Sequence, residues 1–119
     1  MNGVNFPEAH ATVELLGDAA TFNVAISDAL TLIKRIGGFG QAVTGLSLTA
    51  SKDLRIGSKV KVDIAQGAAA RNVAFAQLGS PVVATSLVGD INDRDVITLT
   101  WDGVSFVADS TWQKILAAA

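Results

Sequence analysis

The chain has 119 residues, of which 50% are hydrophobic and 17% charged, and it contains no cysteine. This length fits one domain, and the formal net charge of −2 argues against a nucleic-acid-binding protein, which normally has a basic surface. The missing cysteines exclude disulfides and thiolate metal sites, and no stretch approaches the roughly 18 consecutive apolar residues that cross a bilayer.

The low charged fraction has a consequence of its own. Soluble domains usually carry about 25% charged residues, so a chain with 17% has less charged surface than most monomers. Part of the hydrophobic fraction is alanine, which is only weakly hydrophobic. Even so, we expect part of the apolar surface to contact another chain.

Residues 1–10 are predicted to form an N-terminal arm. A glycine and a proline interrupt this short segment, and Val4 and Phe6 give it two apolar side chains for contacts. No basic run precedes an apolar run at its start, so we expect no secretory signal. His10 is the single histidine, and since no Gly-x-Ser-x-Gly motif accompanies it, we interpret it as a surface or interface residue.

Residues 11–109 are predicted to form one mainly β domain, an antiparallel β-sandwich that is jelly-roll-like and has one or two short helices. The clearest strand pattern is Lys59–Ile64, in which three apolar residues alternate with charged ones. Similar patterns recur at spacings near 8–12 residues, separated by turn residues. No internal repeat of about 20–50 residues is visible, which argues against a solenoid. The other strand patterns lie at 12–16, 22–26, 46–48, 71–78, 81–88 and 95–108.

Residues 27–36 carry signals for a helix. Ser27 suits the N-cap, Asp28 the first turn, Lys34 and Arg35 the last turn, and Gly37 the left-handed position after the helix. A strand through the two leucines at 30 and 32 is the alternative. We expect the helix.

The strongest local turn signal is Asp102-Gly103, a dipeptide favoured in two-residue hairpins. Such a turn would pair Trp101 with Val104 and continue in register along the two strands. All the resulting partners would lie on one face of the sheet. The sequence therefore predicts both the turn and the register of this hairpin.

Residues 110–119 are predicted to be a C-terminal tail or short helix. Trp112, Ile115 and Leu116 have the spacing of one helical face, and Ser110 suits the N-cap. A helix this short is marginal alone in water. We therefore expect these apolar residues, like Val4 of the arm, to contact the domain, another subunit or a larger lattice.

The loop 89–95 is the most chemically suggestive stretch. Its oxygen-bearing side chains at Asp90, Asn92, Asp93 and Asp95 are of the kind that bind calcium. The spacing departs from an EF-hand, and Asp and Asn also stabilise turns through their own backbone. We interpret the loop as a turn and leave cation binding open. We identify no catalytic, cofactor-binding or metal-binding residues elsewhere, and we expect no enzymatic activity.

The segment Gly89–Val107 resembles the closing hairpin of small β-sandwich virion proteins of tailed bacteriophages. In those proteins a polar turn precedes an alternating strand, a tight Asp-Gly-type turn follows, and an aromatic strand ends the domain. Leu54–Ile64 is similar to a strand entry of the same kind of module. The resemblance covers roughly residues 44–108 and concerns strands and turns, with no invariant site.

The resemblance implies a non-enzymatic particle component, either a capsid decoration (cement) protein or a head or tail fibre module, commonly a homotrimer. We therefore expect a self-associating protein on the exterior of a virion that binds the major capsid protein or another virion protein. The expected contact residues are Val4, Phe6, Trp112, Ile115 and Leu116. The alternative is a receptor- or glycan-binding fibre module, for which Trp112 is the one candidate sugar platform.

Overall fold

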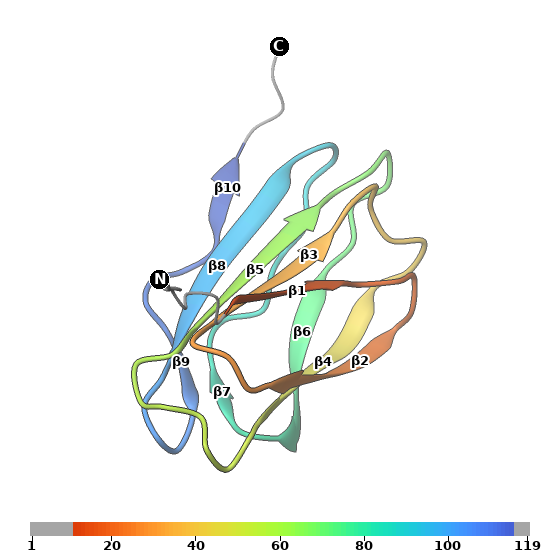
Figure 1. The fold of residues 1–119 in the computed structure, drawn as a ribbon. Coiled ribbons are helices and arrows are strands. Elements are labelled where there is room, and N and C mark those ends of the chain that lie inside the picture. Colours follow the sequence, from red (N-terminus) through yellow and green to blue (C-terminus); the bar gives the residue numbers. More distant parts are fainter. Residues whose placement is uncertain (1–10, 116–119) are drawn as a thin grey trace, which may run out of the picture.

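The computed structural model describes residues 11–115, which form a mainly β structure of two sheets and contain no helix (Figure 1). The strands are β1 (Ala11–Leu15), β2 (Thr21–Ile26), β3 (Leu30–Arg35), β4 (Val43–Ala50), β5 (Lys59–Ala65), β6 (Val73–Gly79), β7 (Val82–Val83), β8 (Arg94–Trp101), β9 (Phe106–Ala108) and β10 (Gln113–Ile115). The predicted arm, including Val4 and Phe6, lies outside the described residues, and so does Leu116. Residues 11–115 include no helix long and apolar enough to cross a membrane.

The larger sheet, sheet A, has the strand order β1-β3-β5-β8-β9-β7, and the smaller one, sheet B, has the order β2-β4-β6. Two short strands share one edge of β8, because β10 pairs with Arg94–Val96 and β9 pairs with Leu99–Trp101. Both sheets contribute to one hydrophobic core, with Ile33, Val62 and Leu99 from sheet A meeting side chains such as Leu46 and Ile26 from sheet B.

The first six strands alternate between the two sheets, so the chain winds as a coil of three turns (Figure 1). Each strand from β3 to β6 lies parallel to the strand two positions before it. Ala11, Leu30 and Lys59 are register partners in successive turns, but they are 19 and then 29 residues apart. Because the loops differ in length, this winding is not visible in the sequence as a repeat.

The expectation of antiparallel sheets was therefore only partly right. Among the pairs of strands in residues 11–115, the antiparallel ones are those of β8 with β5, β9 and β10, while the others are parallel. Parallel neighbours need a crossover connection. From β1 to β6 each crossover contains one strand of the opposite sheet, as β2 does between β1 and β3. Jelly-roll connectivity is not confirmed.

The predicted helix at residues 27–36 was wrong, because this segment contains β3. Thr31 and Ile33 point into the core, and β3 pairs with β1 on one side and with β5 on the other. The basic residues that looked like helix-end signals serve tertiary contacts instead. Lys34 binds Asp63, and Arg35 donates to the backbone carbonyls of Gly38 and Leu16. Long-range pairing on both edges overrides the local capping signals.

The hairpin at Asp102 exists with a different register. Trp101 pairs with Phe106 and not with Val104, so the loop has four residues. The Asp102 carboxylate accepts hydrogen bonds from the backbone amides of Val104 and Ser105 at 2.8 and 2.7 Å, which stabilises the longer loop and lowers the pKa of Asp102. The shift is two residues, so the predicted core face is retained: the Trp101 and Phe106 rings pack with centroids 4.7 Å apart.

The predicted C-terminal helix is also wrong over its described part, because residues 113–115 form strand β10. Trp112, immediately before β10, stacks on Phe75 with ring centroids 6.2 Å apart. Its indole N–H donates to the carbonyl of Thr85 at 2.7 Å. These contacts, together with pairing to β8, hold this segment extended against the domain.

Leu46→Ala tests the position of the core. Leu46 is fully buried on β4, so its truncation is expected to lower the free energy of unfolding by about 2–5 kcal/mol. Leu78→Ala is the matched control, because Leu78 is 69% exposed and its loss should change stability by about 0.5 kcal/mol or less. Urea unfolding followed by tryptophan fluorescence measures both. Equal losses in the two variants would contradict the assigned core.

Candidate functional site

The outer face of sheet A carries an exposed apolar strip at one edge. Val13 and Leu15 of β1 are 61% and 62% exposed, and Leu30 of β3 is 46% exposed. The register places Val13 beside Leu32, while Leu30 lies beside Ala11. We call Val13, Leu15, Leu30 and Leu32 the β1–β3 strip. Large contiguous apolar patches are uncommon on the surface of monomeric proteins, and they often mark contacts with other molecules.

The strip borders an unpaired strand edge. β1 is the terminal strand of sheet A, and among the described residues its one strand partner is β3 (Figure 1). All five residues of β1 are exposed. An edge strand offers free N–H and C=O groups to another chain, so this corner of the fold combines apolar side chains with backbone groups ready to pair.

The middle of the outer face of sheet A, around β5, carries charged side chains. Asp63 on β5 binds Lys34 at 3.1 Å and Arg94 at 2.8 Å, and Lys59 binds Asp109 at 3.0 Å. Burial raises the pKa of Asp63, but the hydrogen bonds from Arg94 and Lys34 outweigh it and hold the pKa below 3.8. The charged pairs therefore cover the middle of the sheet and end where the β1–β3 strip begins.

The structure brings few of the expected contact residues together. Val4, Phe6 and Leu116 lie outside the described residues. Trp112 is half-buried against Phe75, while Ile115 is 42% exposed on β10. β10 pairs with β8 in the middle of sheet A, so Ile115 is separated from the β1–β3 strip by two strands.

Sequence reasoning recognised a strand near residues 12–16 but missed its role. The alternation of Ala11, Val13 and Leu15 with Thr12 and Glu14 is visible in the sequence. The sequence predicted a strand there, and no buried face was assigned to it. In the structure the apolar face is the outer one, because Val13 and Leu15 share the side of the sheet with Leu30 and Leu32. The strip becomes visible only when the parallel register places the apolar residues of β1 beside those of β3.

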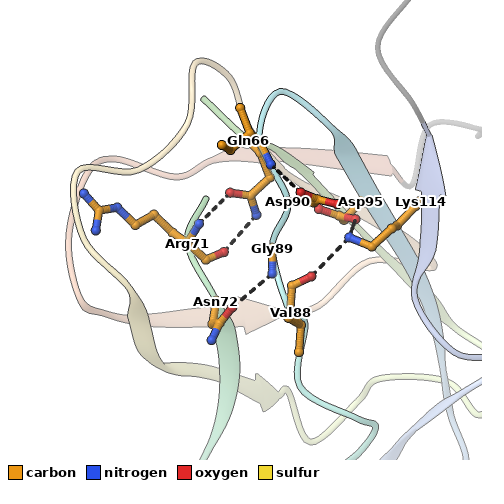
Figure 2. A network of polar contacts seen from close by, with 9 residues as sticks. Gln66, Arg71, Asn72, Val88, Gly89, Asp90, Asp95 and Lys114 are labelled. Atoms are coloured by element: carbon orange, nitrogen blue, oxygen red, sulfur yellow. Dashed lines mark hydrogen bonds and ion pairs between the residues drawn. The ribbon is translucent and has the colours of Figure 1, made fainter. Parts of the chain in front are cut away.

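A second feature is a buried polar network that joins β8 and β10 to the loops after β5 and before β8 (Figure 2). Asp95 on β8 is fully buried. Lys114 on β10 reaches its Oδ1 at 3.4 Å and also donates to the carbonyl of Val88 at 3.1 Å, whereas Oδ2 accepts no hydrogen bond. Burial raises the pKa of Asp95 above its ordinary value of 3.8, although Lys114 opposes the shift. This pair ties β10 to the sheet.

Gln66 forms the other half of the network. Its Nε2 donates to the carbonyl of Arg71 at 2.9 Å, and its Oε1 accepts from the amide of Arg71 at 2.8 Å. The amide of Gly89 donates to Oδ1 of Asn72 at 3.0 Å, and a Cβ at Gly89 would lie 2.3 Å from the Arg71 carbonyl oxygen. These contacts lock two loops together, so the network is structural.

One carboxylate of the acidic loop accepts a hydrogen bond within the turn, and another pairs with a lysine on a neighbouring strand. Asp90 accepts from the amide of Ile91 at 3.0 Å, and Asp95 faces Lys114 across the sheet. Asn92 takes a left-handed conformation with φ of 59°. No group of three His, Cys, Asp or Glu side chains placed to hold a metal ion occurs in the part of the chain that the structure describes.

A pocket of about 310 Å³ lies between the β2–β3 turn and the β4–β5 loop. Asp28, Asp53, Arg55 and Ser58 line it. Thr12 donates a hydrogen bond to Asp28, and the Ser58 hydroxyl donates to the carbonyl of Arg55 at 2.7 Å. The hydroxyl of Ser58 is therefore engaged by the backbone.

Comparison with known proteins adds no family. No protein-family model matches the chain, and no curated protein is similar to it in sequence.

Asp63→Asn and Asp95→Asn are expected to change the free energy of unfolding with opposite dependence on pH. The lowered pKa of Asp63 means that its ionised form stabilises the fold, so Asp63→Asn should be less stable than the wild type at pH 7, and the difference should shrink as pH falls below 3.8. The raised pKa of Asp95 means that the wild type loses stability as pH rises above 3.8. Asp95→Asn should therefore gain stability relative to the wild type from pH 3 to 7. Urea unfolding at each pH measures this, and parallel profiles for the two variants would refute the assignments.

Proposed function

We propose that the chain is a non-enzymatic structural protein that self-associates through the β1–β3 strip and the free edge of β1. The β1–β3 strip carries the proposal, because contiguous exposed apolar side chains of this kind mark protein contacts. The charged pairs around Asp63 cover the neighbouring strands and border the strip. The low charged fraction of 17% is consistent with surface lost to a partner.

We further propose that the assembled protein decorates the capsid exterior of a bacteriophage particle and stabilises its lattice. This step rests on the resemblance of residues 44–108 to small phage virion proteins. In this proposal the major capsid protein is the partner, and Val4, Phe6, Ile115 and Leu116 are contact residues together with Trp112. The two sheets serve as a β-sandwich scaffold. A homotrimer is the assembly that the resemblance implies.

The alternative is a fibre or glycan-binding module, and it would use Trp112 as a sugar platform. The ring of Trp112 already stacks on Phe75, and its indole N–H is occupied by the Thr85 carbonyl. These contacts leave less of the ring for a sugar. Glycan-array binding that is lost in Trp112→Ala would favour this alternative over the capsid role.

Val13→Lys tests self-association. We expect the wild type at micromolar concentration to scatter light as a multiple of 12.3 kDa. Val13→Lys should shift the mass to that of the monomer, with at least about tenfold weaker association, because a charge in an apolar contact loses its hydration. The control is Val104→Lys, since Val104 is 72% exposed in the β8–β9 turn and lies outside the β1–β3 strip. A monomeric wild type would refute the proposal.

A further inference from the structure

We propose that the partner of β1 is β1 of a second copy, paired antiparallel about a two-fold axis that lies midway between the two Val13 residues. This inference rests on the self-association proposed above and gives it a two-fold geometry in place of the homotrimer that the resemblance implies. It joins the two copies of sheet A into one continuous sheet, with the two β1–β3 strips side by side on its outer face.

The direction of the free backbone groups follows from one hydrogen bond. The amide of Leu16 donates to the carbonyl of Lys34 on β3 at 2.8 Å. Backbone groups alternate in direction along a strand, so those of Thr12 and Glu14 also point toward β3. The N–H and C=O groups of Ala11, Val13 and Leu15 therefore point away from the sheet. In the antiparallel arrangement these residues form the hydrogen-bonded pairs.

The side chains of β1 are complementary to themselves about Val13. Pairing there places Val13 opposite Val13 of the second copy and Ala11 opposite its Leu15, so the outer row is apolar throughout. Thr12 lies opposite Glu14 of the second copy, and no like charges meet. This match of side chains selects a second copy as the occupant of the edge.

Other registers fit less well. A shift by one residue places Glu14 in the apolar row. A shift by two in one direction places Glu14 opposite Glu14, where like charges destabilise the pair, and in the other direction it leaves Leu15 without a partner from β1. The register centred on Val13 uses all five residues of β1 without either penalty.

The strand at the opposite edge of sheet A, β7, has features that discourage pairing with other chains, whereas β1 has few of them. The far edge strand, β7, has two residues and directly follows Pro81, and short edge strands and prolines discourage pairing with other chains. β1 contains no lysine or proline, and its register with β3 has no bulge. β2, the corresponding edge of sheet B, likewise contains no lysine or proline, so the experiment must compare the two edges.

Single-cysteine variants compare them, because the wild type contains no cysteine. Hydrogen-bonded antiparallel partners have Cα atoms about 5.5 Å apart, which lies within the range of disulfides. Under mild oxidation, Val13→Cys should form a covalent dimer of twice 12.3 kDa. Ala25→Cys on β2 and Val104→Cys in the β8–β9 turn should remain uncrosslinked. Cross-linking through Ala25→Cys in place of Val13→Cys would overturn the proposal.

A charge-swap experiment tests the same register without oxidation. Val13→Lys and Val13→Glu should each be monomeric alone, because like charges meet across the two-fold axis. An equimolar mixture of the two should form a heterodimer, with association at least about tenfold stronger than either variant alone. Failure of the mixture to associate would overturn the proposal.

The remaining outcomes separate this inference from the proposed function. A wild-type trimer, or an oligomer without the Val13→Cys cross-link, would overturn the two-fold pairing and leave self-association intact. A monomeric wild type would refute both. Association that arises only after deletion of residues 1–9 would mean that these residues cover β1 within one chain, which also overturns the pairing.

Discussion

The structure depends on the need of each strand edge for backbone hydrogen bonds. This need is met in the middle of sheet A, but the described residues leave it unmet at the outer edge of β1. The winding gives β3 and β5 a partner on each side, and β8 and the short strands beside it complete sheet A beyond β5. β1 has β3 on one side and no further turn of the described chain on the other. Such unpaired edges are managed in natural proteins by charges, prolines or bulges, and β1 has little of this protection.

The side chains on the outer face of sheet A differ from place to place. Around β5 this face carries ion pairs such as those of Asp63, which keep the middle of the sheet compatible with water. On β1 and the first residues of β3 the outer face is apolar. Buried networks serve a different purpose, since Asp95 and Lys114 hold the last strand in place. The last strand, β10, is thus held to the sheet by buried polar contacts, whereas β1 and β3 expose apolar side chains.

Local chemistry in the sequence predicted the strands better than their partners. The alternation at Val60, Val62 and Ile64 identified a half-buried strand correctly, because its period of two depends on neighbouring residues alone. The turn at Asp102 was found, but its register was missed because the carboxylate supports a longer loop. The helix expected at residues 27–36 failed because β1 and β5 pair with that segment across 19 and 29 residues.

The candidate site was harder to predict for the same reason. The β1–β3 strip exists only when Val13 lies beside Leu32, and no sequence pattern states that register. The pairing of Asp95 with Lys114 likewise depends on the way β10 joins β8. The low charged fraction led us to expect an apolar contact surface, but the residues chosen for the contact were in the two terminal segments.

Amide hydrogen exchange of β1 as a function of protein concentration tests the central claim most directly. The account predicts that the amides of Ala11, Val13 and Leu15 exchange fast in dilute protein and slow down as concentration rises, because a second chain then accepts their hydrogen bonds. Amides of Thr12 and Glu14, which point toward β3, should depend less on concentration. Exchange at Val13 that is equally fast at every concentration would contradict the account.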